Sequence, residues 1–255
     1  MEQEKSVSLG AVYCAYNACS FLTESVQRIY PVVDKIIFLV NFKPWLGEPF
    51  PAIERTISDI LAIPDDKSKF EIVIGYWKNE AEQRNVGLKI LREKDISWCL
   101  IIDDDELYNQ GELENIRHML VSAMHAAYLI YHQIYWKNRD TIIEGLFGSF
   151  PTFARTDGRV HFNENRMILV NKEYTWFSVS ADAIVCHHMS YIRSDEEMSR
   201  KIQSFSHADD VVSDWYERIW LGDVTTDLHP LVGPRFKRTL PAAESDYQLQ
   251  PFKAV

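Results

Sequence analysis

The chain has 255 residues, 46% hydrophobic and 25% charged, which is ordinary for a globular protein and enough for one large α/β domain or two small ones. The formal net charge of -10 argues against broad binding to nucleic-acid phosphates and suits a protein that holds divalent cations, because hard cations prefer carboxylate oxygens. The polar N-terminal segment, the cysteines without CxxC spacing and the lack of a long apolar run predict a cytoplasmic protein with buried, reduced thiols.

Strand and helix patterns alternate along the first half of the chain. Apolar, often β-branched runs predict strands at residues 7–15, 35–40, 70–77 and 97–102. Apolar residues at helical spacing predict helices at residues 20–30, 53–63, 79–94 and 111–123. This alternation is typical of βαβ units, so we expect an α/β fold with a mostly parallel central sheet and helices on both faces.

The pattern becomes a mixed α+β pattern after residue 126. Strand-like segments are predicted at residues 126–135, 149–154, 159–162, 167–170 and 183–186, and a helix at 194–207. The stretch from residue 222 on is rich in proline and turn residues. We therefore expect a single domain over residues 1–255, with a nucleotide-binding half to about residue 125, a mixed half over 126–221 and a C-terminal tail over 222–255.

An acidic cluster follows the apolar run Trp-Cys-Leu-Ile-Ile at residues 98–102. Its members are Asp103, Asp104, Asp105 and Glu106. Ligands of open α/β sheets collect at the carboxyl ends of the strands, and adjacent carboxylates repel one another unless a cation compensates them. A divalent metal that carries a diphosphate would supply that compensation, whereas the alternative is a solvated acidic turn.

Five segments in this order resemble GT-A fold glycosyltransferases, in particular the family-two-like enzymes of bacteria and phages. They are VYCAYN (12–17), VDKIIFLV (33–40), AEQRNVGL (81–88), LIIDDDE (100–106) and HHMSY (187–191), the last followed by a helix with Lys201. The chain departs from the family at Ala18, where Glu is common, and at Asn41, where many members carry Asp. The resemblance implies a GT-A-like fold and a metal-dependent transferase that uses a nucleotide-sugar donor, foremost a UDP-sugar.

The resemblance also implies roles for the acidic residues. Asp103 would contact the ribose or the metal, and Asp105 would hold the metal on the donor diphosphate as a catalytic residue. Asp104 occupies the variable middle position, and Glu106 would support or ligate the metal. Mn²⁺ and Mg²⁺ suit such a site because they bind few protein carboxylates together with phosphate oxygens.

The late histidines would complete the metal site, with His188 as the first choice and His187 as the reserve, because a neutral imidazole is a good ligand for Mn²⁺. The donor-binding candidates are Tyr16, Asn17, Asn41, Lys43, Arg84, Asn85, Asp103 and Asp104. Arg84 suits either a phosphate or a site carboxylate, since a guanidinium pairs with both. Trp45, beside Lys43, suits either stacking on the donor or simple packing.

An inverting transferase also needs a general base. Glu164 lies in a segment that resembles the acceptor region of some relatives, although Phe162 and Asn163 separate it from His161; Glu144 and Asp140 are the alternatives. The acceptor is left open, and a nucleic acid suits the negative charge poorly. Two other functions compete with the transferase. One is a nucleotidyltransferase, disfavoured because no Gly-rich loop follows the first strand, and the other is a non-catalytic nucleotide-sugar-binding protein.

Overall fold

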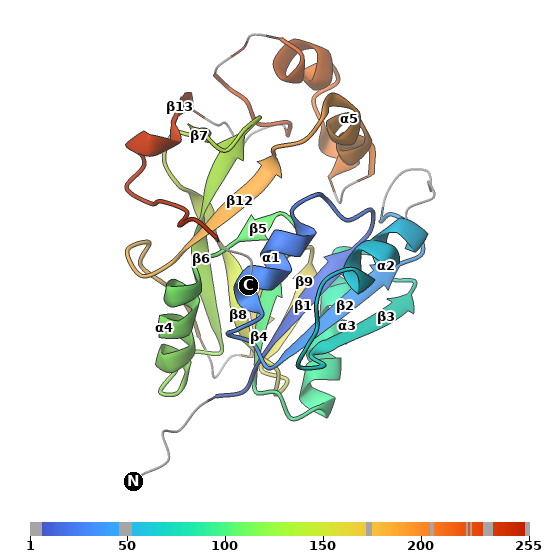
Figure 1. Cartoon of the computed structure of the whole chain (residues 1–255), viewed down its shortest axis with the longest axis vertical. Coiled ribbons are helices and arrows are strands. Elements are labelled where there is room, and N and C mark those ends of the chain that lie inside the picture. Colours follow the sequence, from blue (N-terminus) through green and yellow to red (C-terminus); the bar gives the residue numbers. More distant parts are fainter. Residues whose placement is uncertain are drawn as a thin grey trace.

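The computed structural model describes residues 7–45, 53–171, 175–204, 207–222, 224, 226–231 and 237–252 (Figure 1). The strands are β1 (Leu9–Ala15), β2 (Lys35–Asn41), β3 (Phe70–Gly75), β4 (Trp98–Ile102), β5 (Glu106–Leu107), β6 (Ala127–Trp136), β7 (Thr141–Ile143), β8 (Phe147–Arg155), β9 (Val160–Glu164), β10 (Met167–Val170), β11 (Trp176–Ser178), β12 (Val185–Tyr191) and β13 (Thr239–Pro241). The α-helices are α1 (Leu22–Ile29), α2 (Ile53–Leu61), α3 (Glu80–Glu93), α4 (Gln110–Leu120) and α5 (Asp195–Ser204). Short helical turns lie at Ala208–Asp210, Tyr216–Trp220 and Ala242–Glu244.

The central sheet confirms the predicted mixed α/β fold. β4, β1, β2 and β3 lie side by side and parallel, in that order. β8 runs antiparallel between β4 and β6 and so joins the second half of the chain to the same sheet. β12 lies parallel to β6 and antiparallel to the short β5. The division into a nucleotide-binding half, a mixed half and a C-terminal tail stays a prediction.

Helices cover both faces of the parallel strands, as predicted (Figure 1). Alternate residues of β1 belong to different cores, because successive side chains of a strand point to opposite faces. Tyr13 packs in the core under α1, α2 and α4, whereas Val12 packs in the core under α3 and the β9–β10 hairpin. A third core, which contains Trp136, Trp215 and Trp220, lies near α5.

Helix α3 shows how local sequence places an element that supports the later site. Asn79 is the N-cap of the helix, and its side chain accepts a hydrogen bond from the Glu82 N–H (2.8 Å). Gly87 allows close contact with β1, because a Cβ built there would lie 2.5 Å from Val12 Cγ1. The helix therefore packs tightly on the strand and fixes the position of its first turns.

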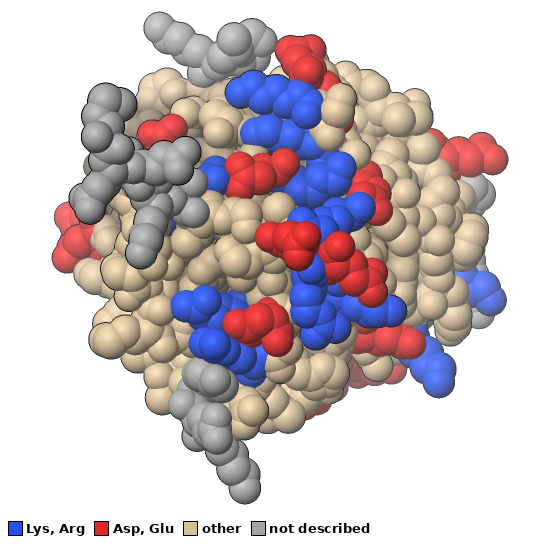
Figure 2. All heavy atoms as spheres, turned by 90° about the horizontal axis from the view of Figure 1, so that it is seen from below, with Lys and Arg blue, Asp and Glu red and all other residues tan. Residues whose placement is uncertain are grey.

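The end of the molecule at the amino ends of the parallel strands carries charges of both signs. Figure 2 shows Lys and Arg side chains interleaved with Asp and Glu on the face seen from below. Lys94 pairs with Glu71 (2.7 Å) and Arg117 with Asp34 (2.8 Å) near this end. Opposite charges thus neutralise one another locally. Within the described residues, no helix is both long and apolar enough to cross a membrane.

Candidate active site

A cavity of about 490 Å³ opens at the carboxyl ends of β1, β2 and β4 and is bounded on its other side by α5. Most of the predicted site residues line it, namely Tyr16, Asn17, Asn41, Lys43, Arg84, Asp103, Asp104, Asp105, Glu106 and His188. The topology explains this gathering, because parallel strands deliver their ends to one edge of the sheet. The volume lies in the range of ordinary small-molecule sites.

The acidic cluster forms a tight turn between β4 and β5. The Glu106 N–H donates to the Asp103 carbonyl (3.1 Å), and the Met189 N–H of β12 donates to the Asp105 carbonyl (2.7 Å). Because a tight turn points successive side chains in different directions, the four carboxylates meet different sets of partners. Four adjacent acidic residues are thereby accommodated at the end of a buried strand.

Asp105 is the most heavily paired member of the turn. Its Oδ2 lies 2.8 Å from Arg193 Nη2 and 3.1 Å from Lys201 Nζ, and its Oδ1 lies 3.2 Å from His188 Nε2. Burial raises the pKa of Asp105, but Lys201, His188 and Arg193 outweigh it and hold the pKa well below the usual range. Asp105 is therefore a carboxylate at neutral pH.

Arg84 of α3 binds the first carboxylate of the turn. Its Nη2 lies 2.8 Å from Asp103 Oδ1 and 2.7 Å from Glu80 Oε1, and its side chain is 1% exposed. Burial raises the pKa of Asp103, but the charge of Arg84 and then that of Arg166 lower it further than burial raises it. Of the two partners that its chemistry suits, the structure gives Arg84 a carboxylate.

Arg166 is a site residue that the sequence reasoning missed. It pairs with both carboxylate oxygens of Glu106, contacts Asp103 (3.4 Å), and donates to one backbone carbonyl of β4 (2.9 Å) and one of β8 (3.0 Å). The turn between β9 and β10 delivers it, with Asn165 in the left-handed conformation (φ 46°) that asparagine tolerates. That asparagine was the one local clue to a hairpin turn at this position.

Asp104 turns away from the other carboxylates, towards the loop after β1. Its Oδ2 accepts a hydrogen bond from the Cys19 N–H (2.6 Å). Burial and the charge of Asp105 raise the pKa of Asp104 to about 6. The middle residue of the motif thus ties the acidic turn to the first strand.

The predicted donor end of the cavity combines polar and aromatic side chains. Asn17 has a left-handed backbone (φ 52°), which lets the chain turn sharply at the end of β1 and places Tyr16 and Asn17 on the cavity wall. Asn41 is 1% exposed, and its amide pairs with the backbone of Trp77 (3.1 and 3.3 Å). Its polar atoms therefore hold β2 to the segment after β3.

Lys43 and Trp45 also line the cavity. The ammonium of Lys43 lies 6.0 Å from the Tyr76 ring centre, and the indole N–H of Trp45 donates to Gln83 (2.9 Å). Trp45 thus has a fixed packing partner while it faces the cavity. Leu46 and Gly47, which follow Trp45 in the sequence, lie outside the described residues.

Three predicted site residues lie away from the cavity lining. His187 is 1% exposed and its Nδ1 pairs with the Tyr135 hydroxyl (3.1 Å), because adjacent residues of β12 face opposite sides. The Asn85 amide pairs with the backbone of Phe162 (2.7 and 2.8 Å) and joins α3 to β9. Glu164 is an exposed residue at the end of β9.

The Asp105–His188 pair fits a divalent cation. Its two ligand atoms, Oδ1 and Nε2, are 3.2 Å apart. Ligands at right angles around an octahedral ion at about 2.1 Å are about 3 Å apart, so one ion can contact both. A carboxylate oxygen with a neutral imidazole nitrogen suits Mn²⁺, and the oxygen alone suits Mg²⁺.

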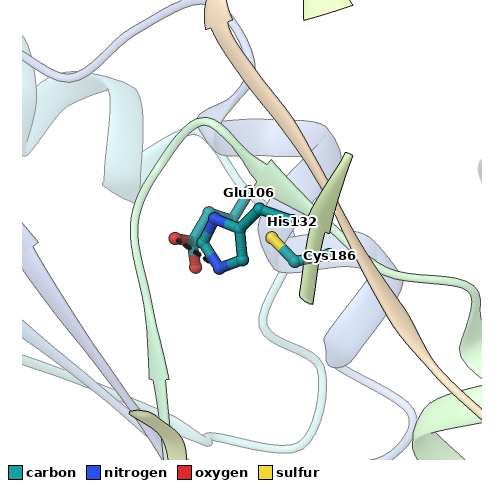
Figure 3. Close-up of side chains that lie close together, drawn as sticks. All are labelled: Glu106, His132 and Cys186. Atoms are coloured by element: carbon teal, nitrogen blue, oxygen red, sulfur yellow. Dashed lines mark ion pairs between the residues drawn. The ribbon is translucent and has the colours of Figure 1, made fainter. Parts of the chain in front are cut away.

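Glu106, His132 and Cys186 form a second group that is spaced to hold a metal ion, with ligand atoms within 4.8 Å of one another (Figure 3). His132 Nε2 is buried and has no hydrogen-bond partner among the described residues. However, Arg166 already pairs with both oxygens of Glu106, and burial raises the pKa of Cys186 well above its usual value. Because metals bind the thiolate, we favour Asp105 and His188 as the ligands.

The comparisons with known proteins give weak likenesses. No protein-family model matches the chain, and no curated protein matches it. Solved structures similar to it include S. aureus TarS 1-349 (TM-score 0.46, 15% identity), TarS 1-349 in complex with UDP-GlcNAc (0.42, 14%) and S. aureus TarS (0.40, 14%). They match 72%, 68% and 69% of this chain and 61%, 59% and 38% of theirs, so the chain spans less than two thirds of those proteins. Likenesses this weak carry no argument about function, which has to rest on the site.

Proposed function

We propose that the protein is a glycosyltransferase that moves a sugar from a nucleotide-sugar donor, foremost a UDP-sugar, to an acceptor hydroxyl. The observation that carries the proposal is a metal-competent pair, Asp105 and His188, beside two cations, Arg193 and Lys201, in one cavity. A metal–diphosphate complex needs both ligands for the ion and cations for the phosphate oxygens. The cavity supplies both at the carboxyl edge of the sheet, where α/β proteins bind nucleotides.

Each residue has a physical role in this proposal. A Mn²⁺ or Mg²⁺ ion, when bound, supplies Lewis-acid stabilisation of the departing diphosphate. Asp105 and His188 would hold it, while Arg193 and Lys201 donate to phosphate oxygens. The loop after β1, with Tyr16, would contact the nucleoside.

We propose that one of two glutamates is the general base that deprotonates the acceptor hydroxyl. Glu164 is the first candidate because of the sequence resemblance, whereas Glu197 of α5 lines the cavity. Of the earlier alternatives, Glu144 pairs with Arg238 (3.4 Å), and neither Glu144 nor Asp140 is among the described residues that line the cavity. A base variant such as Glu197→Gln or Glu164→Gln should retain donor binding and lose transfer, because only the acceptor proton is affected.

The decisive experiment is a thermal-shift and isothermal-titration panel of UDP-, GDP- and dTDP-sugars with and without Mn²⁺, followed by assays of donor hydrolysis. We expect one nucleotide class to bind in a metal-dependent way and to be hydrolysed slowly. Asp105→Asn should abolish the metal dependence. Binding without hydrolysis or transfer would indicate a binding protein, and nucleotide-sugar synthesis from a nucleoside triphosphate would indicate a nucleotidyltransferase. No binding across the panel would refute the proposal.

A further inference from the structure

Asp105 carries protein cations on the same carboxylate that would hold the metal. Oδ1 faces His188, while Oδ2 receives Arg193 (2.8 Å) and Lys201 (3.1 Å). The Asp105 side chain is only 6% exposed, so solvent screens these charges weakly. The carboxylate is thus neutralised from within the protein.

Arg193 and Lys201 make the binding of a divalent cation without a nucleotide electrostatically unfavourable. Such a cation would add two positive charges next to two fixed ones, in a place of low effective dielectric constant. Bound to Oδ1 and His188, it would share the single charge of Asp105 with Arg193 and Lys201 on Oδ2, which leaves three cations around one carboxylate. Free metal should therefore bind poorly.

A cation that enters with a nucleoside diphosphate brings the missing counter-charge. The Lys201 ammonium also donates to the Ser190 hydroxyl (2.6 Å), and Arg193 Nε donates to the Ser190 carbonyl (3.2 Å). Ser190 therefore keeps both cations at the cavity wall when they leave Asp105. Phosphate oxygens in the cavity can then accept the hydrogen bonds that Asp105 gives up.

We propose that Lys201 and Arg193 exclude free divalent cations from Asp105, so that the metal binds only together with the diphosphate. The inference rests on the proposed function for the nature of the ligand. It makes the two cations exchange partners during donor binding, from carboxylate to phosphate. No covalent bond forms or breaks in this exchange.

The test is electron paramagnetic resonance of Mn²⁺ titrated into the full chain, with and without UDP. The variant is Lys201→Met, and Lys201→Arg retains the charge at the same place. Lys89→Met is the matched control, because Lys89 is exposed on α3 and pairs with Glu93 at the surface (3.6 Å). Circular dichroism and melting temperature check that each variant folds.

We expect Lys201→Met to bind free Mn²⁺ about tenfold or more tightly than the wild type, because one competing positive charge is gone. Lys201→Arg and Lys89→Met should match the wild type. With UDP present the order of the Mn²⁺ affinities should reverse, since Lys201→Met lacks the ammonium that donates hydrogen bonds to the phosphate.

The outcomes separate this inference from the proposed function. Free Mn²⁺ affinity that is equal in Lys201→Met and Lys89→Met, with both variants folded, overturns the inference. Failure of UDP to bind the wild type overturns the choice of a UDP-sugar as the donor, whereas a tightened Mn²⁺ affinity in Lys201→Met would still show that Lys201 competes for Asp105.

Discussion

Replacing Arg166 with methionine tests whether the acidic turn is stabilised by the cations that the structure places around it. Glu106 is fully buried, and its main counter-charge is Arg166. Without Arg166, taking up a proton costs Glu106 less free energy than staying a buried carboxylate without a counter-charge. From an unfolded pKa of about 4.3, protonation at pH 7 costs about 4 kcal/mol, and two lost hydrogen bonds to backbone carbonyls add about 1 kcal/mol each. We expect a loss of about 4–6 kcal/mol at pH 7, in line with other buried pairs broken from one side.

The pH dependence of this loss follows from the same argument. Burial already raises the pKa of Glu106, and removing Arg166 raises it further, so the folded variant binds a proton that the unfolded chain releases. The variant therefore gains stability relative to the wild type as the pH falls towards the unfolded pKa. At pH 5 protonation costs only about 1 kcal/mol, so about 3 kcal/mol of the difference should vanish, while the loss from the two backbone hydrogen bonds remains.

Urea denaturation at pH 7 and pH 5 measures both effects. Adding Glu106→Gln to Arg166→Met should recover much of the stability at pH 7, because the buried charge is then absent. Arg55→Met is the control, since Arg55 pairs with Asp59 at the surface (3.6 Å) and should change stability by less than about 0.5 kcal/mol. A loss that is the same at both pH values, or a double variant no better than Arg166→Met, would refute the reasoning.

Glu24→Gln should destabilise the protein by about 1 kcal/mol at pH 7 in urea titrations, since Glu24 is half-buried between two arginines that, against the effect of burial, lower its pKa. A carboxylate whose pKa is lowered by folding stabilises the protein at a pH above its pKa in the unfolded chain, and this stabilisation is lost as the pH falls through its pKa in the folded protein. The difference in the free energy of unfolding between Glu24→Gln and the wild type should therefore vanish in acid and not in alkali. Gly87→Ala should lower the free energy of unfolding by about 1–2 kcal/mol, because the overlap with Val12 exceeds the gain in helix propensity. Gly111→Ala, where no atom lies within 4 Å of the new Cβ, should be neutral or stabilising, and equal effects at both glycines would contradict this account.

The sequence located the acidic turn because a strand end is a local pattern. Apolar residues up to Ile102 predict a buried strand, and the change to Asp103 marks its carboxyl end. The parallel sheet follows from the alternation of elements, and it brings Asn17 to the same edge as the acidic turn. The fold class and the place of the cavity were thus within reach of sequence reasoning.

Sequence reasoning offered Arg84 as a partner of a site carboxylate, but it did not place Arg166, Arg193 and Lys201 around the turn. The sequence led us to expect that a metal compensates the carboxylates, whereas the structure shows side chains doing so. Arg166 lies 60 residues from Glu106, and Lys201 lies 96 residues from Asp105. Contacts over such separations depend on how β8, β9 and α5 pack, and no local periodicity encodes that.

Adjacent histidines of β12 give a direct test of how the strand assigns roles. His187 and His188 differ by one position, and the strand turns them to opposite sides. His187 is 1% exposed, and burial lowers its pKa to about 3, so it is a neutral partner of Tyr135. His188, with 22% of its side chain exposed, faces Asp105 in the cavity.

The two alanine variants should therefore fail in different ways. His187→Ala should lower the free energy of unfolding by about 2–3 kcal/mol, because it opens a cavity and leaves the Tyr135 hydroxyl unpaired, while Mn²⁺–UDP affinity stays unchanged. His188→Ala should cost less than about 1 kcal/mol and weaken Mn²⁺–UDP binding at least tenfold, since it removes a ligand nitrogen. Urea titration and calorimetry measure the two quantities. If His187→Ala lost metal-dependent UDP binding and His188→Ala kept it, His187 and not His188 would be the metal ligand. The alternation of side chains along β12 would then not decide which histidine binds the ion.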